Sequence, residues 1–189
     1  MIFVMFFRKP FDYYIMRPPE KVRLVFLELI SDLRKTGNQL GEVSKDGLTI
    51  ESQISRTNWK DGEVSDEDPA TVKLKYFYYN YLLEFYATNL KKRHKKDFDM
   101  NTIWYQIYDP NKKDFHDWHD HMPHASLCHV WYLKLPNGYG TEFRINDKII
   151  RPKVKEGDLL VFPPNIFHRS PENTSKKEKI ILSFNTVWA

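Results

Sequence analysis

Cysteine is almost absent from this chain of 189 residues, which contains only Cys128. A disulfide within the chain is therefore excluded, and a single thiol fits a reducing cytoplasm. Long apolar runs are also missing, because no segment approaches the roughly twenty residues of a membrane-spanning helix. The apolar start, Met1–Phe7, has no charge before it and is too short for a signal-peptide core, so we expect a strand there. We expect a cytoplasmic protein that does not enter a membrane.

A large charge imbalance is missing as well, since 29 Lys and Arg residues face 25 Asp and Glu residues. Much of the small positive excess lies in Lys91–Lys96, near the expected end of a helix, where cations complement the helix dipole. Elsewhere the sequence shows no basic groove studded with aromatic residues, which is the usual mark of a nucleic-acid site. We therefore favour a solvated helix end, and nucleic acid is not an expected partner.

The first half of the chain is predicted to be helical. Lys21–Lys35 has apolar residues at helical spacing and ends near Gly37, and a second helix begins at Asp68 and Pro69 and runs to about Leu90. The apolar stripe of the first helix comprises Val22, Leu24, Val25, Leu27, Leu29, Ile30 and Leu33. The aromatic residues of the second helix that we expect in the core are Tyr76, Phe77, Tyr81, Phe85 and Tyr86.

From residue 101 onward the sequence consists of short β-branched or aromatic runs separated by turn residues. The expected strands are Ile103–Tyr108, Leu127–Leu135, Thr141–Ile145, Leu159–Phe162 and Ile180–Val187. Short strands joined by such turns favour a jelly roll that closes on a central pocket. We predict a mainly β fold with flanking helices (α+β), a cupin-like double-stranded β-helix. A single domain, residues 1–189, would have its helical buttress at about 18–92 and its jelly-roll core at about 101–189.

Histidine is concentrated: five of the seven histidines lie between residues 116 and 129, and a sixth is His168. Imidazole is the commonest protein ligand of transition metals. On a strand, His119 and His121 would point to one face about 6.5 to 7 Å apart, and Asp117 would share that face. His168 follows an apolar run and a stiff turn, and can supply a third ligand. We predict a metal site at His119, His121 and His168 with open coordination positions, and Asp117 is the reserve ligand.

The remaining histidines of this stretch are expected to be ordinary surface or core residues, or to hydrogen-bond behind the ligands. They are His116, His124 and His129.

These features resemble the Fe(II)- and 2-oxoglutarate-dependent oxygenases, particularly a branch of uncharacterised phage and marine-bacterial proteins and the prolyl hydroxylase-like proteins. Tyr108, a turn and then His119–Pro123 resemble the family's strand tyrosine and its His-x-Asp motif with a following proline. Gly157–Pro163 and His168 resemble the strand and the distal histidine ligand. The resemblance covers roughly residues 104 to 188.

The resemblance also implies a 2-oxoglutarate site. Lys179 stands where the family has a cation that pairs with the distal carboxylate of this co-substrate, and Tyr132 matches an aromatic residue that contacts it. Tyr108 and Ser183 are the other expected contacts, and strand alternation would place Lys179 and Ser183 on one face. One departure is His121, which stands where most of the family has a carboxylate. The exchange raises the charge of the site by one and should alter metal affinity and redox poise.

The resemblance implies a non-haem Fe(II) dioxygenase that couples oxidative decarboxylation of 2-oxoglutarate to hydroxylation of a substrate. No side chain beyond the metal ligands is then required as an acid or base. Two alternatives stay open: a three-histidine cupin-type dioxygenase without 2-oxoglutarate, in which Lys179 would lack a purpose, and a non-catalytic metal- or ligand-binding jelly roll. If neither His121 nor Asp117 binds, the iron could be held by two histidines, as in some halogenases, or the activity could be lost.

The substrate is not indicated by the sequence, and protein side chains, nucleobases and small metabolites all fit such a fold. Segments Ile50–Asp66 and Asn137–Tyr139 are candidates for the pocket mouth, although solvated loops of this composition are common. The expected location is the cytoplasm, or the host cytoplasm if the protein is phage-encoded. The oligomeric state is not predicted.

Overall fold

The computed structural model describes residues 12–35, 69–111, 113–136 and 140–189, and the backbone of residues 55–56, 59–60 and 63–64. Met1–Phe7, Asn137–Tyr139 and most of Ile50–Asp66, for which the sequence carried expectations, lie outside these ranges. Among the described residues, no helix combines the length and the apolar character that crossing a bilayer requires.

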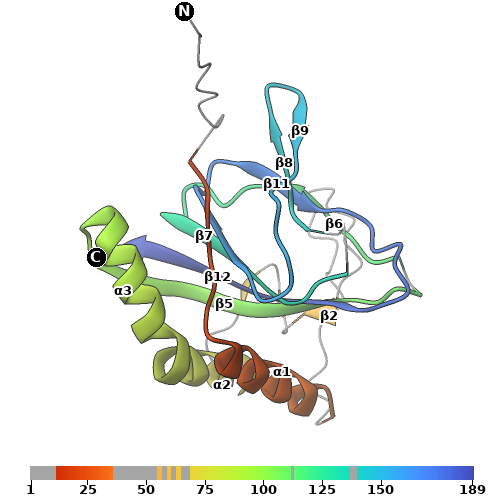
Figure 1. Ribbon diagram of the computed structural model, residues 1–189, viewed down its shortest axis with the longest axis horizontal. Coiled ribbons are helices and arrows are strands. Elements are labelled where there is room, and N and C mark those ends of the chain that lie inside the picture. Colours follow the sequence, from red (N-terminus) through yellow and green to blue (C-terminus); the bar gives the residue numbers. More distant parts are fainter. Residues whose placement is uncertain are drawn as a thin grey trace, which may run out of the picture.

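The structure has three layers: helices, a large sheet and a smaller sheet (Figure 1). The large sheet has the strand order β1-β10-β7-β12-β5-β2, and the small sheet has the order β6-β11-β8-β9. A separate pair is formed by β3 and β4. Every pairing between described strands is antiparallel. This is the predicted mainly β jelly roll with flanking helices.

The strand bounds are β1 Tyr14–Met16, β2 Ser55–Arg56, β3 Trp59–Lys60, β4 Glu63–Val64, β5 Phe98–Tyr108, β6 His116–His119, β7 Leu127–Lys134, β8 Glu142–Ile145, β9 Lys148–Ile150, β10 Leu159–Phe162, β11 Phe167–Ser170 and β12 Lys179–Trp188. The five strands that the sequence predicts correspond to β5, β7, β8, β10 and β12. The sequence did not predict β1, β9 or β11 as strands, and β11 carries His168.

Helix α1 spans Glu20–Lys35 and begins with an acidic residue and ends with basic ones, as the helix dipole favours. Its buried residues are Val22, Phe26, Leu29, Ile30 and Leu33. The predicted stripe was too broad, because Leu24 is 52% exposed. Phe26, which the stripe omitted, is fully buried and packs edge-on against Trp131 of the large sheet.

The second helical segment is divided into α2 Pro69–Phe77, the π-helical turn η1 Tyr78–Leu82, and α3 Leu83–His94. Its fully buried positions recur every four residues: Leu74, Tyr78, Leu82, Tyr86 and Leu90. On an α-helix of 3.6 residues per turn, residues spaced by four drift gradually around the helix axis. The π turn contains more residues per turn, so it compensates for this drift and keeps the five side chains on one face. The prediction that all five aromatic residues are core residues was wrong for Tyr76 and Tyr81, which are 62% and 47% exposed.

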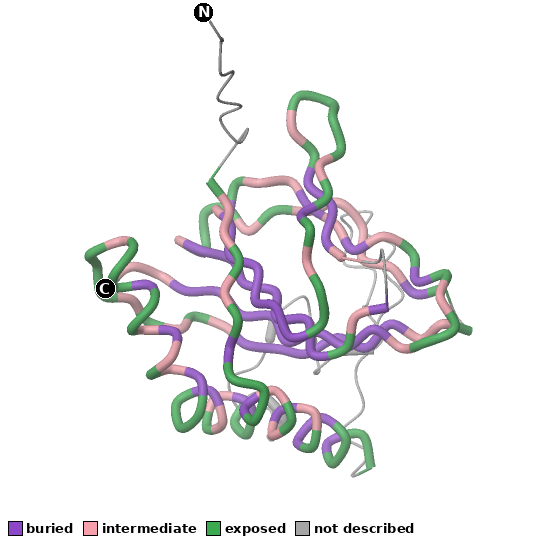
Figure 2. Tube along the Cα trace, viewed as in Figure 1, coloured by how far each residue is buried: buried purple, intermediate pink, exposed green. Residues whose placement is uncertain are grey.

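Strand alternation divides the interior into two cores. On β12, Ile180, Leu182 and Phe184 pack with the helices, whereas Ile181 and Ser183 face the space between the two sheets. Figure 2 shows how continuous the burial is along the strands of the large sheet. The large sheet therefore packs one apolar face against the helices, and its other face lines a pocket.

Candidate metal centre and adjoining pocket

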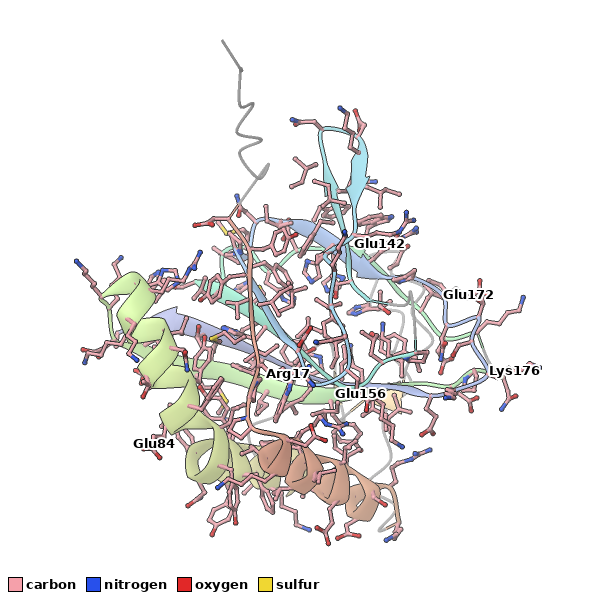
Figure 3. The ribbon with its side chains drawn as sticks, in the orientation of Figure 1. Arg17, Glu84, Glu142, Glu156, Glu172 and Lys176 are labelled. Carbon is pink, nitrogen blue, oxygen red and sulfur yellow. The ribbon has the colours of Figure 1, made fainter. Side chains whose placement is uncertain are left out.

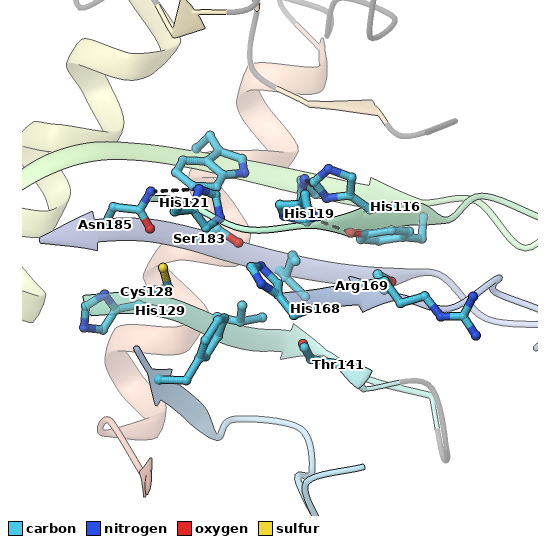
Figure 4. A pocket seen from close by; sticks show the side chains of 17 residues that line it. His116, His119, His121, Cys128, His129, Thr141, His168, Arg169, Ser183 and Asn185 are labelled. Atoms are coloured by element: carbon cyan, nitrogen blue, oxygen red, sulfur yellow. Dashed lines mark hydrogen bonds between the residues drawn. The ribbon is translucent and has the colours of Figure 1, made fainter. Parts of the chain in front are cut away.

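Three histidines meet between the two sheets. His119 ends β6, His168 lies opposite it on β11, and His121 follows two residues after β6. One ligand nitrogen from each lies within 4.8 Å of the others. Figure 4 shows the three side chains around the same pocket. The structure thus brings together the residues that the sequence selected as metal ligands.

His121 reaches this position by a different route from the one predicted. The sequence argument placed it on the strand of His119, but β6 ends at His119 and His121 belongs to the following loop. The loop is held by a hydrogen bond of 3.0 Å from the backbone N–H of His121 to the carbonyl of Pro164. A backbone contact, and not strand alternation, therefore holds the loop that carries His121.

The tautomers of two rings follow from their hydrogen bonds. Nδ1 of His119 lies 2.7 Å from the carbonyl oxygen of Asp117, and Nδ1 of His168 lies 2.8 Å from that of Ile166. A carbonyl can only accept, so Nδ1 carries the proton in both rings. The Nε2 lone pairs are then available to a metal, and the backbone fixes the ring orientations.

His121 is held by a side chain instead. Its Nδ1 lies 3.4 Å from the amide Nδ2 of Asn185 on β12. In this orientation the amide donates and Nε2 of a neutral His121 carries the proton. Rotation of the amide exchanges its nitrogen and oxygen, so that Oδ1 accepts from Nδ1–H and the Nε2 lone pair is available, as it is in the other two rings.

Burial keeps the rings of His121 and His168 neutral. Burial, together with the neighbouring histidines, lowers the pKa of His121 to about 3 and holds the pKa of His168 well below its usual value. Metal binding requires the neutral imidazole, so the site needs little proton release at neutral pH.

Asp117, the reserve ligand, is not brought into the group. Its Oδ1 accepts a hydrogen bond of 2.7 Å from the backbone N–H of Trp118. Within the part of the chain that is described, the cluster of potential ligands contains no carboxylate.

The other histidines of the stretch differ from one another. The ring of His116 stacks on that of His119 at 4.0 Å between centroids, and its Nδ1 lies 3.4 Å from the amide of Gln106. His124 is exposed. His129 is buried, donates from Nδ1 to the Phe184 carbonyl at 2.9 Å, and accepts from the hydroxyl of Tyr86. His129 is thus a core residue.

Lys179 lies at the start of β12, opposite Tyr108 of β5. Its side chain is buried, with Nζ 4.1 Å from the centre of the Tyr108 ring and donating a hydrogen bond to Oγ of Ser170. Burial lowers the pKa of Lys179 to about 7. A carboxylate that binds beside this buried amine would favour the charged, protonated form of Lys179.

The remaining predicted co-substrate residues lie in the same interior. The Tyr108 hydroxyl donates to Oε1 of Gln106 at 3.1 Å, and the Tyr132 hydroxyl donates to Oγ1 of Thr141 at 2.8 Å. Ser183 lines the pocket. Gln106 and Asn185 also line the pocket but were not predicted from the sequence. Strand alternation could have found them, since each lies two residues from a chosen residue on the same strand.

The pocket extends from the three histidines to Tyr108 and Ser170, which Lys179 contacts, and its cavity volume is about 30 Å³. Apolar side chains such as Val130, Phe162 and Ile181 form part of its wall. Most of the other lining side chains carry imidazole, hydroxyl or amide groups, so the pocket offers several polar contacts to a small ligand.

No protein-family model and no curated protein sequence matches this chain. Solved structures do match. The 2-oxoglutarate-dependent non-haem epimerase SnoN of nogalamycin biosynthesis superimposes with a TM-score of 0.69 at 10% identity, over 94% of this chain and 78% of its own. A prolyl hydroxylase from Trichoplax adhaerens, solved with a peptide of the hypoxia-inducible factor, gives 0.61 at 13% identity, over 92% and 83%.

HygX from Streptomyces hygroscopicus, solved with nickel and 2-oxoglutarate, gives a TM-score of 0.61 at 8% identity, over 94% of this chain and 83% of its own. At such low identities the similarity defines the fold alone. The chain has the jelly-roll fold of the 2-oxoglutarate-dependent Fe(II) oxygenases.

Proposed function

We propose that the protein is a non-haem Fe(II) dioxygenase that couples oxidative decarboxylation of 2-oxoglutarate to hydroxylation of a substrate. The observation that carries this proposal is the convergence of His119, His121 and His168 in a pocket between the sheets of this fold. Buried Lys179, at the start of a strand whose other inward residues line that pocket, supports it.

The donor set fits Fe(II). Neutral imidazoles suit iron as well as zinc, copper and nickel. Three ligands that approach from one region leave further coordination positions open, as a catalytic site requires. We assign His119, His121 and His168 as the ligands, with the amide of Asn185 orienting His121.

The anchor for 2-oxoglutarate is Lys179. Its ammonium would pair with the distal carboxylate of the co-substrate, while Tyr108, Tyr132 and Ser183 surround the same interior. When bound, iron and 2-oxoglutarate supply the oxidation chemistry, and the apolar wall of Val130, Phe162 and Ile181 excludes water from it.

The structural neighbours include an epimerase and a prolyl hydroxylase, so enzymes with this fold catalyse more than one type of reaction. Protein side chain, nucleobase and small metabolite therefore all stay within the proposed substrate range. The three-histidine cupin and the non-catalytic jelly roll are less favoured, because the structural neighbours named here are 2-oxoglutarate-dependent enzymes.

Anaerobic titration tests the proposal. Protein loaded with Fe(II) should bind 2-oxoglutarate and develop the weak visible charge-transfer band of a bidentate complex. His168→Ala should lose iron and the band, whereas His124→Ala, which changes an exposed histidine, should keep both. If iron binds to the parent protein but the band does not appear, 2-oxoglutarate is not the co-substrate and the proposal is wrong.

A further inference from the structure

The outer face of the small sheet carries arginine and aromatic side chains in alternation. The inward residues of these strands include His119, His168 and Phe143, so their neighbours point outward. Register places Phe167 opposite Arg144 and Arg169 opposite Glu142. We call this outer surface the arginine–aromatic face, and its residues are Trp118, Glu142, Arg144, Ile149, Arg151, Phe167 and Arg169.

The planar groups of this face are stacked. The rings of Trp118 and Phe167 are within 9° of parallel, with centroids 6.0 Å apart. The guanidinium of Arg144 lies 4.5 Å from the Phe167 ring and 5.2 Å from the Trp118 ring, and that of Arg169 lies 4.6 Å from the Trp118 ring. Arg144 is exposed, and the other three side chains are partly exposed. The face thus presents several flat cationic and aromatic groups to solvent.

The charge of the face is positive. Glu142, its one carboxylate, is buried and accepts hydrogen bonds from Arg151 at 2.7 Å and Arg169 at 2.8 Å. The three arginines therefore exceed the acidic charge by two. Figure 3 labels Glu142 on this sheet, away from the helices. An anionic partner complements such a surface.

We propose that the arginine–aromatic face binds single-stranded nucleic acid. Bases without a pairing partner stack on aromatic rings and on guanidinium planes, and the arginines attract the phosphates. An acidic peptide would use the charge but would have no use for the stacked planes. The sequence alone could not indicate this surface, because strand pairing brings together residues from three separate segments, at 118, 142–151 and 167–169.

The face lies close to the pocket. Strands β6 and β11 present His119 and His168 to the interior and Trp118 and Phe167 to the exterior. Arg169 lies between the two, because it lines the pocket and its guanidinium lies over the Trp118 ring. In Figure 4 the side chain of Arg169 extends away from the three histidines. A nucleic acid bound on this face would therefore lie on the opposite side of the small sheet from the candidate metal ligands. The binding itself does not depend on iron or 2-oxoglutarate.

Fluorescence anisotropy tests this proposal, with the full chain in low salt, no added metal, and a labelled thymidine oligonucleotide of about 15 nucleotides. The parent should bind the oligonucleotide. Arg144→Ala should weaken binding by about tenfold, since each stacked base contributes substantially. Lys92→Ala removes the same charge from an exposed site at the end of α3 and should change binding less than about twofold.

Two further measurements distinguish a contribution of base stacking from a contribution of charge. Arg144→Lys keeps the charge but removes the plane, and it should bind nearly as weakly as Arg144→Ala. Polyglutamate at the same charge concentration should not displace the oligonucleotide. The proposal is overturned if the parent does not bind, if Lys92→Ala matches Arg144→Ala, or if Arg144→Lys binds like the parent. Efficient displacement by polyglutamate would also overturn it and would point to an acidic protein partner.

Discussion

His121 differs from the other two candidate ligands in how its ring is held. Backbone carbonyls orient His119 and His168, whereas the side chain of Asn185 orients His121. The ring that stands where a carboxylate would be expected is therefore the one whose support a single substitution can change. Such supporting hydrogen bonds commonly affect metal affinity by 10- to 100-fold.

Asn185→Ala should weaken Fe(II) binding by about tenfold or more, because His121 loses its orienting partner. Asn185→Asp should strengthen binding, since a carboxylate accepts from Nδ1–H and adds negative charge near the metal. Competition titration of Fe(II) against a chromophoric chelator at pH 8 measures both effects. Asn89→Asp, which adds the same charge to the surface of α3, is the matched control and should bind like the parent. Equal affinities in all four proteins would refute the assignment.

Lys179→Met keeps most of the buried volume but removes the cation. Loss of a charged hydrogen bond should weaken 2-oxoglutarate binding by about 10- to 100-fold, and Fe(II) affinity should stay within about twofold. Calorimetric titration of the iron-loaded, anaerobic protein measures the first effect, and iron titration measures the second. Unchanged 2-oxoglutarate affinity in the variant would show that another residue anchors the co-substrate.

At the level of elements, the turn before β10 depends on Gly157. Its φ of +87° is unfavourable for other residues, and a Cβ there would lie 2.9 Å from Nη2 of Arg17. Hydrogen bonds also hold the turn against β7. Gly157 donates to the Tyr132 carbonyl at 2.7 Å and accepts from the Trp131 indole at 3.0 Å.

Gly157→Ala should lower the free energy of unfolding by about 1–3 kcal/mol through backbone strain and contact with Arg17. Urea unfolding measures the loss. In the Arg17→Ala background the contact is gone, so the same substitution should cost less while the strain persists. A cost of Gly157→Ala near zero would mean that the turn relaxes without penalty.

The helices and the strands with clear apolar runs could be predicted from the sequence, whether the strands are long or short. Strands β5, β7, β10 and β12 follow from their apolar runs, but β9 and β11 contain charged residues and are only three and four residues long. Tertiary pairing, and not local pattern, makes them strands. The exposed position of Tyr81 lies within the π turn, which a periodicity of 3.6 residues does not represent. Tyr76 lies two residues from the buried Leu74 and Tyr78, so it faces away from the core on an ordinary α-helix.

For the site, spacing selected His119, His121 and His168, and the fold brings them together. The loop position of His121 and its contact with Asn185 could not be predicted, because they depend on Pro164 and β12, which are distant from His121 along the chain. The arginine–aromatic face is a similar case, since pairing of four strands assembles it.

At the level of the whole molecule, burial of neutral histidines links stability to pH. Burial lowers the pKa of His129 to about 3, from a usual value of 6.5. Between these values the unfolded chain binds a proton that the folded chain does not. The stability that His129 contributes is therefore complete above about pH 6.5 and is lost as the pH falls.

The metal-free protein should lose about 1.4 kcal/mol of unfolding free energy per pH unit below pH 6 for each such histidine. His129→Leu should be less stable at pH 7.5, since Tyr86 loses its acceptor, but its stability should fall less steeply with pH. Urea unfolding at several pH values between 7.5 and 5 measures both slopes. Identical slopes in parent and variant would show that His129 is protonated in the folded protein.

The contact between His121 and Asn185 spans the two sheets, because the ring follows β6 of the small sheet and the amide lies on β12 of the large sheet. Anything that fills the three-histidine site consequently ties the two halves of the jelly roll together. A ligand present at 100 times its dissociation constant would add about 2.7 kcal/mol to the folded state. The melting temperature therefore becomes a sensor of occupancy, and screening metals, 2-oxo acids and candidate substrates by thermal shift can identify what the protein binds before any turnover is detected.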